Sequence, residues 1–129
     1  MVGLTFQRVS YLPQQTTAGT VNPMELELAT NSTLYARPGQ TAQLIFTVTN
    51  NQEQGSYIDF RCSSQHFSIN VQPQSLQIAA HQTMYVLATV TVSQNTPQDT
   101  EDVITMTAIY GPNSGISKTA YFTVGQEVR

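Results

Sequence analysis

The stretch ARPGQTAQLIFTVTNNQEQGS, residues 36–56, decides the fold class of this chain. Pro38-Gly39 near its start and Asn50-Asn51 near its end are residues that favour turns. Between these turns apolar and polar residues alternate, which is the period of a β-strand with one buried face. The face expected to point inward carries Ala42, Leu44, Phe46 and Val48. The stretch therefore predicts a strand bounded by turns, the beginning of a sheet.

The same alternation recurs along the rest of the chain, and no long window has the three-and-four spacing of an amphipathic helix. Turn residues separate the alternating stretches every ~8–12 residues, which predicts an all-β sandwich or barrel of about seven strands. Short polar loops between consecutive strands favour antiparallel pairing. The residues expected to form the core are Leu44, Phe46, Val48, Ile58, Phe60, Ile69, Val71, Val86, Ala88, Val90, Ile104, Met106, Phe122 and Val124.

The length of 129 residues suits one folded domain. Residues 1–23 are interpreted as an N-terminal strand and linker, with a short strand expected over 3–9 and a loop over 13–20. Residues 24–129 are expected to form the sandwich, with residues 31–36 as a short edge segment. No apolar run is long enough to cross a membrane as a helix.

The composition excludes several classes of function. Charged residues make up 10% of the chain and the net charge is -3, so the polar surface must be built from Gln, Thr, Ser and Asn. Five Lys and Arg residues cannot form a phosphate-binding patch, which argues against nucleic-acid binding. The single cysteine, Cys62, cannot form an internal disulfide.

Three stretches resemble an immunoglobulin-like sandwich: ARPGQTAQLIFTVTNN, INVQPQSLQIAAHQTMYVLATVTVS and TPQDTEDVITMTAIYGPNSGISKTAYFTV. They are similar to the C-terminal immunoglobulin-like module of hemicentin-like proteins with a von Willebrand factor A domain, and to related bacterial cell-surface modules. The resemblance covers roughly residues 24–124 and implies an immunoglobulin-like or fibronectin-like sandwich. The sequence departs from antibody domains in having no Trp and no cysteine pair, and His81 stands where such modules commonly use Gly.

A second resemblance is to the major-sperm-protein type of sandwich, an intracellular scaffold. It rests on the stretches LIFTVTNN, YIDFRCSS and FSINVQPQSLQIAAHQTMYVLATVTV, and the chain from Thr96 onward fits it less well. An intracellular setting would account for the free thiol of Cys62.

Candidate chemistry is weighed against simpler explanations. Cys62 and His66 could form an activated thiolate, but Cys62 continues the apolar face of Ile58 and Phe60 and is better interpreted as a small buried hydrophobe. His66 and His81 with Cys62 or Met84 lack the ligand spacing of a zinc site. We therefore predict no catalytic residue, no cofactor and no metal.

Two further polar features are interpreted in the same way. Asp99, Glu101 and Asp102 lack the spacing of a calcium loop, and we expect a solvated turn that keeps an edge from pairing. Asn31 begins the only N-x-S/T motif and is the candidate glycan acceptor if the protein is secreted by a eukaryote.

Tyrosines supply the remaining candidate site. Tyr57, Tyr85 and Tyr121 fall on faces expected to point outward, where they either form a contact surface or simply cover a sheet. The function expected is a non-catalytic structural or adhesive module of an extracellular or cell-surface protein. Its expected partners are proteins, neighbouring modules or further copies that meet sheet edges. Carbohydrate binding through the tyrosines and the intracellular scaffold are the alternatives.

Overall fold

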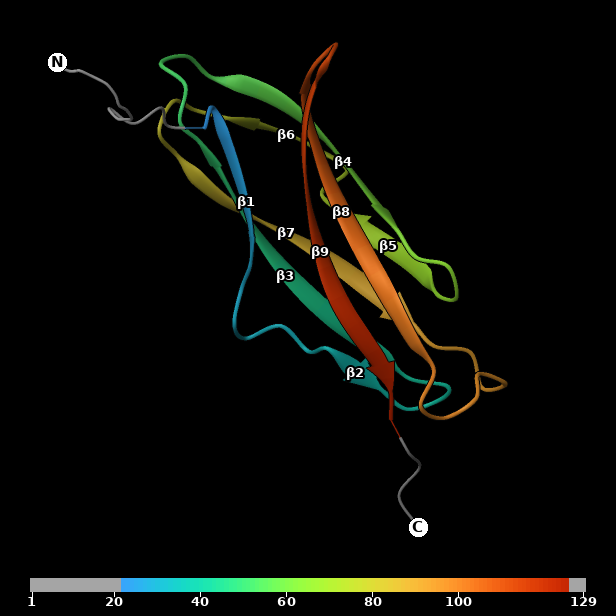
Figure 1. Cartoon of the computed structure of the whole chain (residues 1–129). Helices are drawn as coiled ribbons and strands as arrows, with labels where there is room; N and C mark the ends of the chain where they lie inside the picture. The colour runs from blue at the N-terminus through green and yellow to red at the C-terminus, as the bar shows by residue number, and fades with distance from the viewer. Residues whose placement is uncertain (1–21, 126–129) are drawn as a thin grey trace, which may run out of the picture.

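The structure, a computed structural model, describes residues 22–125, and this part of the chain consists of strands, turns and loops (Figure 1). Within these residues there is no helix, and therefore none that could cross a membrane. The nine strands of the described residues are β1 (Met24–Leu28), β2 (Tyr35–Ala36), β3 (Thr41–Asn50), β4 (Ser56–Ser63), β5 (Ser68–Gln72), β6 (Ser75–Ile78), β7 (Thr83–Thr91), β8 (Glu101–Gly111) and β9 (Ser114–Val124).

The strands form two sheets that pack face to face as a sandwich (Figure 1). The four-stranded sheet has the order β1-β3-β7-β5, and the five-stranded sheet has the order β2-β9-β8-β4-β6. Neighbouring strands pair antiparallel, except that β2 runs parallel to β9. The all-β sandwich is thus confirmed. Seven of the described strands have five residues or more, and β2 and β6 are shorter.

The Pro38-Gly39 turn lies just before β3, a central strand of the four-stranded sheet. Gly39 has a φ of 85°, in the left-handed region, and its N–H donates to the carbonyl of Val92 at 2.8 Å. A Cβ at this position would lie 2.9 Å from Cγ of Gln94. Both the backbone conformation and the close approach therefore require glycine here.

Alternation along the strands fills the space between the sheets as predicted. All the expected core residues are buried except Ile69, which is half-buried. Ile69 lies on β5, an edge strand of the four-stranded sheet. Because β5 has a neighbouring strand, β7, on one side only, Ile69 is less well covered than residues of the central strands. Further buried residues complete the core, namely Met24, Leu26, Ala36, Ala42, Phe67, Ile78, Val92, Ala108 and Ala120.

The N-terminal part of the domain differs from the prediction in detail. The edge segment expected over residues 31–36 is a strand only at Tyr35–Ala36. Upstream, the Ser32 hydroxyl donates to the carbonyl of Ile45 at 3.1 Å and accepts from the N–H of Ile45 at 2.8 Å. The Ser32 side chain thus bonds both the N–H and the carbonyl of Ile45, which would otherwise bond the backbone of a neighbouring strand. The strand expected over residues 3–9 and the linker that follows it to residue 20 lie outside the described residues.

Candidate functional site

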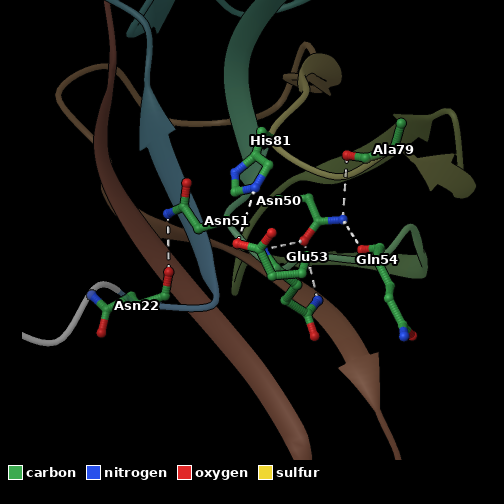
Figure 2. Close-up of polar contacts among 8 residues, drawn as sticks. Asn22, Asn50, Asn51, Glu53, Gln54, Ala79 and His81 are labelled. Carbon is green, nitrogen blue, oxygen red and sulfur yellow. Dashed lines mark hydrogen bonds and ion pairs between the residues drawn. The ribbon is translucent and has the colours of Figure 1, made fainter.

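Asn50, the last residue of β3, is buried and organises one end of the sandwich (Figure 2). Its Nδ2 donates to the carbonyls of Gln54 at 2.9 Å and Ile78 at 3.0 Å, and to that of Ala79 at 3.3 Å. Its Oδ1 accepts from the N–H of Gln52 at 2.9 Å. One amide therefore ties the loop after β3 to the loop after β6, and Asn50 is more than the turn residue expected from sequence.

His81 and Asn51 extend this connection (Figure 2). The His81 N–H donates to the Asn50 carbonyl at 2.7 Å, and its imidazole Nε2 lies 3.2 Å from Oε2 of Glu53, with both side chains exposed. Asn51 Nδ2 donates to the carbonyl of Asn22 at 2.9 Å. These hydrogen bonds join the loop after β3, the loop after β6 and Asn22, which lies just before β1. The cluster therefore stabilises the end of the sandwich and does not form a reactive centre.

The backbone of His81 has a φ of 63°, the left-handed conformation in which glycine is least strained. Replacing His81 by glycine is expected to raise the free energy of unfolding by about 1 kcal/mol, because relief of the backbone strain outweighs the loss of the exposed contact with Glu53. His81→Ala keeps the strain and should not show this gain. Urea denaturation of the three proteins measures the difference, and a His81→Gly protein less stable than His81→Ala would contradict it.

Asp102 corrects the expectation of a solvated acidic turn. Its carboxylate is buried and points into the end of the sandwich, whereas Asp99 and Glu101 are exposed. It accepts hydrogen bonds from the hydroxyl of Ser64, from the N–H of His66 at 2.8 Å and from the N–H of Val103 at 2.7 Å. The carboxylate therefore fixes the loop between β4 and β5. Asp102 lies two residues before Ile104 and therefore falls on the inward face of the alternating strand. This position was the sequence signal from which its burial could have been predicted.

The Asp102 cluster is not a catalytic triad. Ser64 donates directly to the carboxylate, and His66 reaches it through its backbone N–H while its side chain is exposed. A nucleophilic serine needs an imidazole between hydroxyl and carboxylate. The arrangement caps a loop.

Acidification is expected to weaken this cap. Burial raises the pKa of Asp102, but the hydrogen bonds from Ser64, His66 and Val103 and the nearby His66 imidazole together lower it below its ordinary value of 3.8. Because the folded pKa is lower than the unfolded one, the carboxylate stabilises the fold fully above about pH 4. That contribution disappears as the pH falls through the folded pKa.

Asp102→Asn is therefore expected to lower the free energy of unfolding by about 1–2 kcal/mol at pH 7, with the gap to the parent protein narrowing below about pH 4. Urea titrations between pH 2.5 and 7 measure both quantities. Glu101→Gln, next to it on the exposed face, is the control and should leave the curve unchanged. A constant gap across this range would show that Asp102 acts through packing alone.

Cys62 and His66 do not form a nucleophile and base. Cys62 is half-buried against the core on β4, on the face of Ile58 and Phe60, and no hydrogen bond of the described residues joins it to His66. Burial raises the pKa of the Cys62 thiol to about 11, although the Ser63 backbone lowers it slightly. The thiol is therefore protonated at neutral pH and poorly suited to attack.

Slow alkylation of Cys62 is the expected consequence. Because the pKa lies about 2 units above the ordinary value of 9.0, the thiolate fraction at pH 8 falls by about 100-fold. Labelling by iodoacetamide, followed by mass spectrometry, should be at least about tenfold slower than for the same chain in 8 M urea. Equal rates in the two conditions would contradict this assignment.

The residues weighed as metal ligands in the sequence are not brought together. His66 lies beside Asp102 near the start of β8, and His81 lies beside Asn50 at the other end of the sandwich. Within residues 22–125, no group of three or more His, Cys, Asp or Glu side chains is placed to hold an ion.

The three tyrosines singled out in the sequence point outward but lie apart. Tyr85 is on the outer face of the four-stranded sheet, and Tyr57 and Tyr121 are on that of the five-stranded sheet. Tyr121 stands opposite Val103, and the pairing of Asp59 with Ile109 sets Tyr57 level with the far end of β8. Eight residues at ~3.3 Å separate these two levels by roughly 26 Å.

Tyr35 was missed among these aromatics. It is exposed on β2 and pairs with Thr123, two residues from Tyr121 on the same face of β9. Its place next to Tyr121 depends on the parallel pairing of β2 with β9, which local sequence does not show. Asn31, the candidate glycan acceptor, is exposed in the turn between β1 and β2.

Two stacked sheets with this strand order define an immunoglobulin-like β-sandwich module. The sequence gives a narrower assignment: residues 24–124 match the VWA7 Ig-like domain family, and the chain belongs to that family. This confirms the expected resemblance to modules of proteins with a von Willebrand factor A domain. A comparison with curated protein sequences finds no match.

Solved structures with low sequence identity share the fold. A FixG-related protein from Vibrio parahaemolyticus superposes with a TM-score of 0.61 at 14% identity, covering 81% of this chain and 98% of that one. Native alpha-2-macroglobulin from E. coli gives 0.61 at 16% identity over 81% of this chain and 7% of its own. A family 123 glycoside hydrolase from Clostridium perfringens gives 0.63 at 8% identity over 80% of this chain and 27% of its own.

In the last two proteins the matching region is a small part of a much longer chain. The sandwich is thus used as one module within larger proteins. At these identities the likeness concerns the fold alone.

Proposed function

We propose that this chain is a non-catalytic interaction module of an extracellular or cell-surface multidomain protein, with structural or adhesive contacts as its task. The observation that carries the proposal is the exposure of large aromatic side chains on both outer sheet faces, where Tyr57, Tyr85 and Tyr121 are 62%, 67% and 75% exposed. Exposed tyrosines offer rigid apolar area together with a hydroxyl, which suits protein contacts.

The surroundings of these tyrosines support contact rather than electrostatic capture. On the outer face of the five-stranded sheet, hydroxyl side chains pair across strands, as in the hydrogen bond between Thr107 and Ser117 at 2.8 Å. On the other sheet Thr49 and Thr83 pair in the same way at 2.8 Å. A face rich in hydroxyl groups and poor in charge can exchange hydrogen bonds with a partner at low desolvation cost. In a secreted setting, Asn31 is the proposed glycan acceptor.

Sheet edges offer a second mode of contact, by addition of a strand from a neighbouring module or copy. At β2 the Leu34 carbonyl accepts from the N–H of Thr123 at 3.2 Å, and the opposite side of this short strand is an edge of the sheet. The part of β9 that does not pair with β2 carries a charged contact instead: Nζ of Lys118 on β9 lies 3.3 Å from Oε1 of Glu27 on β1. Inward and edge charges of this kind oppose strand addition.

The edge version is tested by placing proline at residue 35. The carbonyls of Leu34 and Ala36 both accept from β9 or the residue directly after it, so the N–H of Tyr35 between them faces the free edge. Tyr35→Pro is expected to reduce self-association, measured by sedimentation velocity over a concentration series, while leaving the core folded. The hydrogen bonds of the Leu34 and Ala36 carbonyls are retained, so circular dichroism and thermal unfolding should match the parent protein. Tyr35→Ala, which keeps the N–H, is the matched control. Association unchanged by proline would remove the β2 edge from the proposal.

The alternatives find less support. The separation of Tyr57 and Tyr121 along the sheet, and the place of Tyr85 on the opposite face, do not provide a single sugar-binding platform from these three side chains. The match to an immunoglobulin-like family favours the first of the two resemblances over the major-sperm-protein scaffold.

A further inference from the structure

Exposed hydrophobic side chains gather at one corner of the sandwich. Among the described residues, six large hydrophobic side chains are exposed, and three of them, Tyr35, Val103 and Tyr121, come from neighbouring strands on the outer face at one end of the five-stranded sheet. The other three are Leu34, Tyr57 and Tyr85, and they do not share this surface: Leu34 lies on the opposite side of the chain from Tyr35. We call Tyr35, Val103 and Tyr121 the Tyr121 corner. Apolar side chains grouped in this way on a protein surface mark an interaction site.

Strand register places the three residues of the corner at adjacent positions on one face of the sheet. Tyr121 of β9 is directly opposite Val103 of β8, and Thr123 is opposite both Tyr35 of β2 and Glu101 of β8. Tyr35 and Tyr121 are thus diagonal neighbours, with Cα atoms roughly 8 Å apart. A Cβ on Gly125 would lie 3.0 Å from Cδ2 of Tyr35, so the Tyr35 ring rests against the backbone there.

A cleft of about 680 Å³ opens beside Tyr121 and Val103. Its other walls come from Ser63 at the end of β4, from Ser64 and Gln65 in the loop that follows, and from Glu101. The buried Asp102 fixes this loop through Ser64 and the N–H of His66, so that the cleft wall is held in place without a ligand. A preformed wall reduces the ordering cost of binding.

The charge of the corner selects the partner. Glu101 and Asp99 are exposed here, and Asp99 is anchored by its N–H donating to the Val124 carbonyl at 2.9 Å. Arg37 is the residue directly after β2. Arg61 of β4 is opposite Thr107 of β8, two same-face positions along β8 from Val103. Carboxylates beside two tyrosine rings complement a cation, which can lie over a ring face and pair with Glu101.

We propose that the Tyr121 corner binds an extended protein segment that carries Lys or Arg between apolar residues. The apolar side chains of the segment cover Tyr35, Val103 and Tyr121, and its cation pairs with Glu101. An uncharged sugar would use the rings but leave Glu101 without a countercharge and the aliphatic Val103 without a partner. The proposal rests on the proposed function as an interaction module and names its surface and the chemistry of its partner.

The experiment is an NMR titration of the ¹⁵N-labelled full chain with two peptides, acetyl-VRLRV-amide and acetyl-VELEV-amide. The first peptide is expected to shift amide signals of β2, β9 and the start of β8, with a dissociation constant on the order of 1 mM or below. Tyr121→Ala should weaken binding by about tenfold, and Glu101→Lys should abolish the preference for the arginine peptide. Tyr85→Ala, on the opposite face, is the matched control and should bind as the parent does.

Several results would overturn the proposal. These are equal binding of both peptides, shifts centred on Tyr85, corner shifts caused by cellohexaose alone, or a concentration-dependent dimer that Tyr121→Ala dissolves. Thermal unfolding of each variant ensures that lost binding is not lost folding. The failure of the corner is distinguishable from that of the proposed function: association that is sensitive to Tyr35→Pro but not to Tyr35→Ala, while neither peptide binds, refutes only the corner.

Discussion

Replacing Asn50 by alanine is expected to lower the free energy of unfolding by about 3 kcal/mol, measured by urea denaturation. The change removes the donor to the Gln54, Ile78 and Ala79 carbonyls and the acceptor for the Gln52 N–H. The side chain is fully buried, so water cannot readily replace these bonds. Each buried polar group left without a partner costs about 1–3 kcal/mol, and the losses at one site do not add in full.

The neighbouring Asn51 provides the matched control. Its side chain makes an exposed hydrogen bond to the Asn22 carbonyl, and Asn51→Ala should cost less than about 1 kcal/mol. Asn50→Asp should be as harmful as Asn50→Ala at pH 7, because a carboxylate cannot donate to three carbonyls, and should recover partly when protonated near pH 4. An Asn50→Ala protein as stable as Asn51→Ala would mean that the loops are held by the backbone alone.

Truncating Phe122 to alanine is expected to lower the free energy of unfolding by about 3–5 kcal/mol. The Phe122 side chain is 1% exposed and packs edge to face against Phe67, with ring centroids 5.3 Å apart. The substitution removes buried apolar area and leaves a cavity between the two sheets that the strands cannot easily collapse to fill. Chemical denaturation followed by circular dichroism measures the loss.

Tyr121, the next residue, makes this experiment specific. Its side chain is exposed on the opposite side of β9, so Tyr121→Ala should change stability by less than about 0.5 kcal/mol. A double-mutant cycle with Phe67→Ala should give a coupling of about 0.5–1.5 kcal/mol for the aromatic pair. Similar losses for the variants at 121 and 122 would contradict the assignment of faces along β9.

Local patterns predicted most of the sandwich. Alternation identified the inward face of β3 from Ala42 to Val48 and that of β7 from Val86 to Val90, because a strand turns successive side chains to opposite sides. Pro112 and Asn113, two residues that favour turns, connect β8 to β9. Hydrophobicity and backbone preference act over a few residues and are therefore visible in the sequence.

The polar clusters and the Tyr121 corner were less accessible. Asn50 and Asp102 each occupy an inward position in an alternating strand, but a polar residue there has no meaning until its partners are known. Ser64 and Asp102 are 38 residues apart, and Tyr35 meets Tyr121 only through a two-residue parallel pairing. No turn propensity or alternation encodes contacts of this kind.

Period-two alternation and turn chemistry were thus sufficient to predict an all-β sandwich or barrel, because each depends on neighbouring residues alone, and the immunoglobulin-like type was predicted by the resemblance of three stretches to a known family. Strand order and register determined the contacts between residues that are far apart in the sequence. They buried Asp102 under the loop after β4, set Asn50 between two loops, separated Tyr57 from Tyr121 and brought Tyr35 beside it. These contacts join residues far apart in the chain, and their geometry exists only once the sheets have paired and packed.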